Sequence, residues 1–316
     1  MKTNYKSKGL ALATAFVVGI LGLSAKTVYI EQNGVRYYWN NTKDYVEVTS
    51  PAKGNTYVGD ISVPESIAYE GKELPVTAVR SDAFAETAVT SVTLPASVTS
   101  IGDYAFDTCD KIKKVTMPGV KTIGHWSFRN CYALESLDFS DNLVSIGNYC
   151  FDKNLKITQV TLPATVTNLG GYVFEGNPQL TTITCYATNP PEIKKGYLDG
   201  VEIYTIFDDE DYGNRVLYVP KGCVDAYKKS LGWHHFGNNI KELQNSGIET
   251  VADNTISVVA KGAGTVCVTV AAPTRIDVVN LNGRIVKSVT AGTGATTISN
   301  LPSGLLLVNG AKVFVR

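Results

Sequence analysis

One set of side chains in the sequence has the residue types of a nucleophilic site. Cys223 is followed by His234, His235 and Asn238, and a thiol, an imidazole and an amide are groups that a cysteine nucleophile uses. The three histidines do not have the zinc-hydrolase spacing, in which two histidines four residues apart enclose a glutamate. The sequence also lacks the serine-hydrolase and phosphate-loop motifs. We therefore predict no catalytic, cofactor-binding or metal-binding residues and interpret the set around Cys223 as structural.

The overall composition is that of a folded, electrically neutral chain. The 316 residues include 29 Lys and Arg and 29 Asp and Glu, so the formal net charge is zero. Binding to nucleic acid or to an anionic membrane surface needs a basic excess, which this chain lacks. Hydrophobic residues make up 44% and charged residues only 18%, which excludes disorder for most of the length. We expect no nucleic-acid partner.

The first 25 residues have the order of parts of a secretory signal peptide. Three lysines among the first eight residues precede an uncharged run over residues 9–23, and the small residues Ser24 and Ala25 follow it. The run is too short for a comfortable membrane span, and no later stretch reaches the ~20 apolar residues that a span needs. Residues 1–25 are predicted to be a cleaved signal peptide, which leaves no membrane-spanning segment in the mature protein. An uncleaved N-terminal anchor is the alternative.

Export to an oxidising compartment raises the question of disulfide bonds. The chain has six cysteines, which are too few for a disulfide-rich scaffold, and none of them forms a Cys-x-x-Cys pair. Cys109 and Cys131 lie 22 residues apart. Small buried thiols are the main interpretation, and one bridge between these two cysteines is the alternative.

Three columns of residues recur every 22 or 23 positions in the middle of the chain. They are a phenylalanine, an Ile-Gly or Leu-Gly pair, and a short apolar-polar-apolar segment. The members are Phe84, Phe106, Phe128, Phe151 and Phe174; Gly102, Gly124, Gly147 and Gly170; and the segments that begin at Val92, Val115, Leu137, Val160 and Ile183. This period predicts a leucine-rich-repeat solenoid in which every unit adds one strand to a parallel sheet. The glycines are interpreted as turn positions with positive φ.

Two further columns of the repeat are predicted to face solvent. One contains the polar residues that flank the inward-facing residue of each strand, because side chains alternate along a strand. Its candidate binding residues are Lys114, Thr116, Asp138, Gln159 and Thr161. The other, two residues before each phenylalanine, contains the aromatic residues Tyr104, Trp126, Tyr149 and Tyr172. These rings are candidate contacts for a protein or a glycan, and the alternative is that they pack on neighbouring units.

The repeat resembles that of a known family. The pattern I-G-x-x-A-F-x-x-C-x-x-[IL]-x-x-V-x-[LM]-P, most complete over residues 101–118, is similar to the BspA-type leucine-rich repeat of bacterial surface proteins, which is abundant in Bacteroidales. The resemblance implies a solenoid with an N-terminal cap over residues 26–77, repeats over 78–190 and a C-terminal cap over 191–245. It also implies an extracellular protein partner, from the host matrix or from another microbe.

A second domain is predicted after a short linker. Residues 244–247 are polar, and the strand-like runs beyond them, with a hairpin turn at Asn282 and Gly283, predict a small β-sandwich over residues 246–316. The segments 279–286, 301–304 and 308–313 resemble parts of the C-terminal sorting domains of the Bacteroidota type IX secretion system. That resemblance implies delivery to the cell surface.

Together these features predict a mainly β protein, in which a leucine-rich-repeat solenoid with two caps is followed by a small β-sandwich. The expected function is that of a secreted or cell-surface, non-catalytic binding or adhesion protein that recognises host or microbial surface proteins through its repeats. The alternative, suggested by the aromatic column, is a glycan-binding accessory protein of a polysaccharide-using bacterium. We expect a monomer without cofactors.

Overall fold

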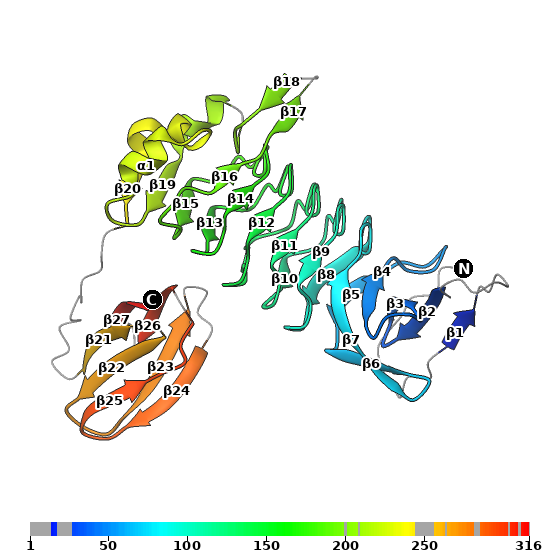
Figure 1. Ribbon diagram of the computed structural model, residues 1–316, viewed down its shortest axis with the longest axis horizontal. Coiled ribbons are helices and arrows are strands. Elements are labelled where there is room, and N and C mark those ends of the chain that lie inside the picture. The colour runs from blue at the N-terminus through cyan, green and yellow to red at the C-terminus, as the bar shows by residue number, and fades with distance from the viewer. Residues whose placement is uncertain are drawn as a thin grey trace. The chain divides into compact units, whose positions relative to one another are not determined.

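The computed structural model describes residues 14–17, 27–198, 201–207, 209–243, 256–262, 264–280, 285–302, 304–308 and 311–315. The prediction of a mainly β fold is confirmed, since the described residues form strands with only one short α-helix and two 3-10 helices (Figure 1). The chain divides into two compact units, Met1–Lys241 and Glu242–Arg316. The predicted linker over residues 244–247 and the turn at Asn282 and Gly283 lie outside the described residues.

The first unit begins with an antiparallel meander. Its strands, paired in chain order, are β1 (Thr14–Val17), β2 (Thr27–Gln32), β3 (Val35–Asn40) and β4 (Val46–Thr49). Buried and half-buried residues alternate along β3, because one face of this sheet covers the core. Strand β1 comes from the predicted signal peptide, and the rest of that peptide lies outside the described residues.

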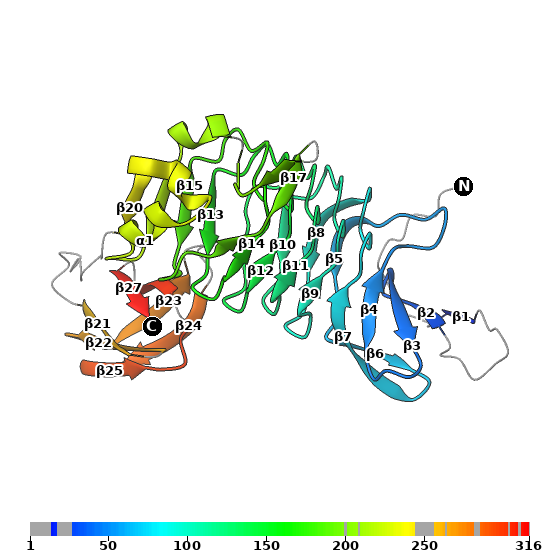
Figure 2. The ribbon, with the colours of Figure 1, turned by 45° about the horizontal axis from the view of Figure 1, so that its top comes forward.

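Two ladders of parallel strands run through the repeats (Figures 1 and 2). The first ladder continues from β4 and consists of β7 (Lys72–Val79), β9 (Ser100–Ile101), β11 (Thr122–Ile123), β12 (Ser145–Ile146), β14 (Asn168–Leu169) and β16 (Glu192–Ile193). The second ladder begins with β5 (Val58–Ser62), β8 (Ala88–Thr93) and β10 (Lys114–Thr116), and resumes with β13 (Gln159–Leu162), β15 (Thr182–Cys185) and β19 (Val216–Val219), followed by β20 (Ile240–Glu242) at the sheet edge. Strand β6 (Ser66–Tyr69) forms a hairpin with β7. We refer to residues 78–193 as the repeat stack.

The second ladder is interrupted at the third repeat, where a strand was expected. Only one parallel bridge, between Thr116 and Asp138, joins this repeat to β10. Phe139 stands where the two neighbouring repeats have Met117 and Leu162, and its ring packs edge-on against Phe151 with centroids 5.7 Å apart. Leu137 and Phe139 are half-buried, although their counterparts in the neighbouring repeats are buried. We attribute the break in the ladder to this larger ring.

The phenylalanine column is the continuous spine of the repeat stack. Phe84, Phe106, Phe128, Phe151 and Phe174 are all 0% exposed. Successive rings are nearly parallel, with centroids 4.8 to 5.8 Å apart. Rings of the neighbouring repeats therefore cover both faces of each inner ring, which is a degree of burial that a single repeat does not provide.

The glycine column has a different cause from the predicted one. Gly102, Gly124, Gly147 and Gly170 do not have positive φ, so the turn interpretation is wrong. A Cβ atom on Gly147 would lie 2.6 Å from the carbonyl carbon of Gly124 and 2.6 Å from the nitrogen of the next residue. Glycine is required because the backbones of neighbouring repeats approach too closely for any side chain.

A column of small hydrogen-bond donors joins each repeat to the one before it. The acceptors are backbone oxygens of the phenylalanine spine. Cys109 and Cys131 donate through Sγ over 2.9 and 3.2 Å, and Asn154 and Asn177 donate through Nδ2 over 3.0 and 2.8 Å. Cysteine in the earlier repeats and asparagine in the later ones therefore make the same contact. We call Cys109, Cys131, Asn154 and Asn177 the donor column.

All six cysteines are free thiols in the structure. Burial raises the pKa of the Cys109 thiol to about 11 and also raises the pKa values of Cys131 and Cys150, so these thiols stay protonated and unreactive at neutral pH. In the unreduced protein at pH 8, we expect Ellman's reagent to titrate the half-buried Cys223 and Cys267 quickly and all six thiols after denaturation. A total of four thiols after denaturation would instead indicate the bridge between Cys109 and Cys131.

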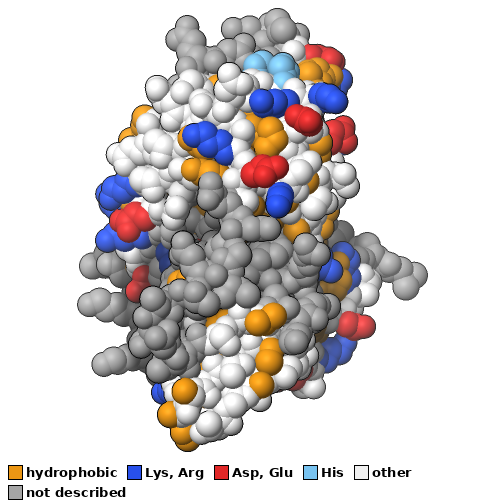
Figure 3. Space-filling model, turned by 90° about the vertical axis from the view of Figure 1, so that its left-hand side faces the viewer, with side chains coloured by type: hydrophobic (Ala, Val, Ile, Leu, Met, Phe, Trp, Pro, Cys, Tyr) orange, Lys and Arg blue, Asp and Glu red, His pale blue; other side chains and the backbone are white. Residues whose placement is uncertain are grey.

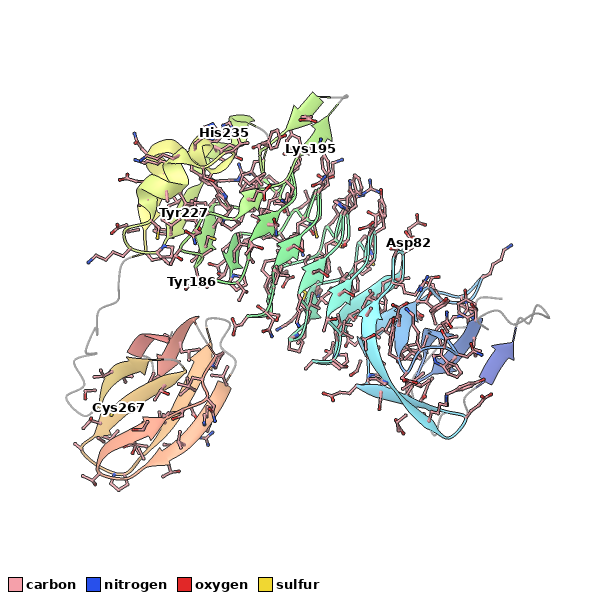
Figure 4. The ribbon with its side chains drawn as sticks, viewed as in Figure 1. Asp82, Tyr186, Lys195, Tyr227, His235 and Cys267 are labelled. Carbon is pink, nitrogen blue, oxygen red and sulfur yellow. The ribbon has the colours of Figure 1, made fainter. Side chains whose placement is uncertain are left out.

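The segment after the last repeat packs aromatic side chains against the end of the stack. It contains the hairpin of β17 (Gly196–Leu198) and β18 (Val201–Ile203), the 3-10 helices η1 (Asp209–Asn214) and η2 (Trp233–Asn239), and the helix α1 (Val224–Lys229). Tyr227, which is labelled in Figure 4, and Trp233 are buried. They donate to the backbone oxygens of Ala187 and Pro191 over 2.8 and 2.7 Å. These contacts fix the segment to the last repeat.

The second unit contains two antiparallel sheets that share one core. One sheet has the order β21 (Ile256–Gly262), β22 (Thr265–Val270), β25 (Gly294–Ile298), and the other has the order β24 (Ile285–Ala291), β23 (Thr274–Asn280), β26 (Gly304–Val308), β27 (Ala311–Val315). Buried aliphatic side chains from both sheets, such as Val268 and Ile276, form the core. Strands β23 and β24 pair on either side of the predicted turn.

Candidate binding surfaces

The structure does not assemble the cysteine set into a catalytic arrangement within the described residues. Cys223 Sγ contacts a backbone oxygen two residues earlier at 3.9 Å, and no hydrogen bond joins it to His234. His234 Nδ1 lies 3.3 Å from the backbone oxygen of Ser230, and the ring of His235 lies beside that of Tyr212 with centroids 5.1 Å apart. The absence of catalysis stays a prediction.

The described residues show neither a metal-binding cluster nor a membrane-spanning helix. No group of three or more His, Cys, Asp or Glu side chains among them is arranged to hold a metal ion. No helix in the described part of the chain is long and apolar enough to cross a bilayer. On the face in Figure 3, acidic and basic side chains are interspersed, in keeping with the zero net charge.

The predicted polar strand face lies on the second ladder. Lys114 and Thr116 belong to β10, whereas Gln159 and Thr161 belong to β13. Asp138 occupies the break between these strands, where it pairs with Thr116 and forms an ion pair with Lys114, with Nζ and Oδ2 3.1 Å apart. Lys114 and Gln159 are exposed, and the other three are half-buried. These five residues form what we call the strand face.

The aromatic column forms a second continuous stack of rings. The centroids of Tyr104, Trp126, Tyr149 and Tyr172 are successively 5.1, 5.7 and 5.4 Å apart. All four residues have positive φ, between 52° and 56°. This left-handed conformation is costly for residues that carry a Cβ atom. Ring stacking offsets that cost and fixes each ring against its neighbours.

Stacking covers both faces of the two inner rings, Trp126 and Tyr149, and leaves their edges accessible. Tyr104, Trp126 and Tyr149 are half-buried, and Tyr172 is only 6% exposed. The guanidinium carbon of Arg129 lies 5.7 Å from the centroid of the Tyr104 ring. A sugar that stacks on an aromatic side chain needs a free ring face, so this geometry favours the packing alternative. Ligand binding by these rings stays a prediction.

A groove that the sequence analysis did not predict lies beside the first ladder. Its volume is about 500 Å³, and its lining includes the residue after several of the repeat glycines. Oδ1 of Asp103 accepts the backbone N–H of His125 over 2.7 Å, and Nδ1 of His125 accepts the backbone N–H of Asn148 over 2.9 Å. Oδ1 of Asn148 accepts the N–H of Gly171 over 3.0 Å. We call Asp103, His125 and Asn148 the groove column.

The sequence carries only a weak signal for the groove column. A polar residue follows each of three successive repeat glycines, at Asp103, His125 and Asn148. The three residue types differ, and the fourth glycine is followed by Gly171. Because the shared property is an acceptor atom and not a residue type, the column is not visible as a repeated letter.

Comparisons with known proteins identify the repeats. Residues 77–196 match the BspA type leucine rich repeat region in six copies, and a search of curated proteins found no match. A leucine rich repeat protein of T. pallidum is 27% identical, with a TM-score of 0.43, over 48% of this chain and 68% of that one. A leucine-rich repeat protein from Bacteroides ovatus is 22% identical, with a TM-score of 0.45, over 58% of this chain and 53% of that one.

A further solved structure is that of a leucine rich cell surface protein from Faecalibacterium prausnitzii, which is 20% identical with a TM-score of 0.32 and covers 56% of this chain and 58% of that one. The family match covers the phenylalanine spine, the donor column and the ladder strands from β8 to β16. The resemblance predicted from the pattern over residues 101–118 is confirmed for this region. Residues 77–196 of this chain are a BspA-type leucine-rich repeat region.

Proposed function

We propose that this chain is a secreted or cell-surface, non-catalytic binding protein whose strand face recognises an extracellular protein partner. The observation that supports this most is the polar strand face itself, where five polar side chains lie on and between β10 and β13. Repeat proteins present extended surfaces of this kind for recognition. The partner class follows from the BspA-type repeats and is a surface protein of a host matrix or of another microbe.

The strand face is held rigidly by the core beneath it. Val115 and Val160, which alternate with its residues, are 2% and 1% exposed, so the strands are anchored in the core. A rigid surface loses little conformational entropy when a partner binds. Lys114 and Asp138 are already paired with each other, so the face offers one charge of each sign, and it also has the two hydroxyl groups of Thr116 and Thr161. Such a surface selects a partner by hydrogen-bond pattern and shape.

Export and surface delivery are the second part of the proposal. The signal-peptide pattern over residues 1–25 supports export. The resemblance of residues 246–316 to sorting domains supports a role of the second unit in delivery or attachment. In this arrangement the repeats bind and the second unit holds the protein at the cell surface.

An array of purified matrix proteins, such as collagen, laminin and fibronectin, tests the binding proposal. We expect one of them to bind the full chain, and expect the double variant Gln159→Arg/Thr161→Arg to weaken that binding at least tenfold, because two long cations would occupy the strand face. The matched control is Thr99→Arg/Thr122→Arg, which adds the same charge at exposed positions on or next to the first ladder. Equal loss in both variants, or no binding to any array protein, would contradict the proposal.

A further inference from the structure

The groove beside the first ladder has polar atoms that its own hydrogen bonds leave unused. In the described residues, Oδ1 of Asp103 is bonded but Oδ2 has no partner, and the hydroxyl of Ser145 has none. Asn168 donates through Nδ2 to Thr167 over 2.8 Å, which leaves its Oδ1 unused. All three residues line the groove and are half-buried. The groove therefore presents acceptors and a hydroxyl group that are available to a ligand.

His125 supplies the complementary donor. Its Nδ1 accepts the backbone N–H of Asn148 over 2.9 Å, so the neutral ring carries its proton on Nε2. The side chain of His125 is exposed and lines the groove. Because Asp103 and His125 are each held by one atom to the backbone of the next repeat, their free atoms have fixed positions before any ligand arrives. A preorganised site of this kind binds at a lower entropy cost.

The floor and one border of the groove are also defined. Gly124 and Gly147 line it without side chains, and the buried Ile123 and Ile146 lie on the strands beside them. The chain leading into the β17–β18 hairpin, which includes Lys195 (Figure 4), borders it. There Nδ2 of Asn148 donates to the backbone oxygen of Lys195 over 3.2 Å. The result is a flat floor that follows successive repeats and has polar atoms fixed along it.

The chemistry of the groove selects among ligand classes. The carboxylate of Asp103 repels an anion. The ammonium of Lys194, which also lines the groove, does not offset this repulsion because it is already paired with Glu192. A metal ion is disfavoured because the described residues hold no group of three suitable ligands. An extended peptide adds to a free strand edge, whereas β11, β12 and β14 are paired on both sides. Hydroxyl groups, which both donate and accept, match a mixture of one N–H, two acceptor oxygens and one hydroxyl.

We propose that this groove binds a linear, neutral oligosaccharide that lies along successive repeats. Oδ2 of Asp103 and Nε2 of His125 hold hydroxyl groups of the sugar, and Ser145 and Asn168 hold those of the next unit. This site is separate from the strand face, which lies on the other ladder, and does not rest on the function proposed for that face. It also differs from the aromatic column, since none of the stacked rings lines the groove.

The test is isothermal titration of the full chain with cello-, laminari-, malto- and mannohexaose. We expect one of them to bind, and expect Asp103→Asn to weaken its binding about tenfold, because the amide keeps the acceptor for the N–H of His125 but loses the outer carboxylate oxygen. Ser145→Ala should weaken binding severalfold. Its matched control is Ser100→Ala, at the equivalent half-buried position of β9, which does not line the groove and should bind as the parent chain does.

Further measurements distinguish saccharide binding in the groove from a loss of stability and from binding at the strand face. The imidazole nitrogen resonances of His125 should shift on addition of the hexaose that binds, and thermal unfolding of Asp103→Asn and Ser145→Ala should match that of the parent. The strand-face variant Gln159→Arg/Thr161→Arg should retain full saccharide binding. Failure of all four hexaoses to bind, binding that Asp103→Asn and Ser145→Ala leave unchanged, or capture of a peptide in the groove instead would overturn the proposal.

Discussion

Replacing Phe128 with alanine is expected to lower the free energy of unfolding of the first unit by about 3–5 kcal/mol. Phe128 is 0% exposed and lies between two parallel rings, with its centroid 4.8 Å from that of Phe106 and 5.2 Å from that of Phe151. Truncation removes the whole ring and leaves a cavity at the centre of the spine. Because each repeat contacts only its neighbours, no other part of the chain moves in to fill it.

Urea unfolding followed by circular dichroism measures this loss. Phe128→Leu, which retains most of the buried volume, should lose less than half as much, and Tyr132→Ala, at an exposed side chain of the same repeat, should change stability by less than about 0.5 kcal/mol. A lower denaturant slope for Phe128→Ala would indicate that the stack unfolds in two parts on either side of the cavity. A loss below about 1 kcal/mol would contradict the role of the ring as part of the spine.

Gly147→Ala is expected to destabilise the first unit by about 3 kcal/mol, although it adds only a methyl group. The new Cβ atom would lie 2.6 Å from two backbone atoms of the preceding repeat, at Gly124 and His125. That backbone is held in place, since the N–H of Gly147 donates to the oxygen of Ile123 over 2.8 Å. Relief of the clash requires the two repeats to separate, which breaks hydrogen bonds of the first ladder.

Gly213→Ala is the matched control for this substitution. Nothing lies within 4 Å of a Cβ atom built there, and its φ is not positive. We expect its midpoint of thermal unfolding to equal or slightly exceed that of the parent chain. If Gly147→Ala unfolded at the same temperature as Gly213→Ala, the close approach of repeats would not be the reason for the glycine column.

The sequence predicts those parts of the fold in which the same residue type recurs in every repeat. The phenylalanines, the Ile-Gly pairs and the strand segments recur at one period, so the period alone predicts which residues share a column and which columns face inward. The pairing of Ile101 with Ile123 and of Ile123 with Ile146 follows this prediction. The spacing of 22 residues between Cys109 and Cys131 likewise equals one repeat, and both thiols make the same contact in the structure.

The features that were missed depend on distances between repeats. A glycine can serve either a positive φ or a close approach, and only the position of the next backbone separates these causes. The break at Phe139 comes from the size of one ring relative to its neighbours, which a periodic pattern does not encode. The groove column was missed because aspartate, histidine and asparagine share an acceptor atom and not a letter.

The two residue types in the donor column have opposite weaknesses. Asn154 and Asn177 each bring a buried Oδ1 without a hydrogen-bond partner, which lowers stability. Cys109 and Cys131 bring no such atom, but their thiols are open to oxidation whenever the chain is unfolded. In an oxidising environment this risk is limited to the time before the first repeats fold, since the thiols are buried afterwards. The repeat stack therefore contains both residue types: cysteine favours the stability of the folded state, and asparagine avoids oxidation during folding.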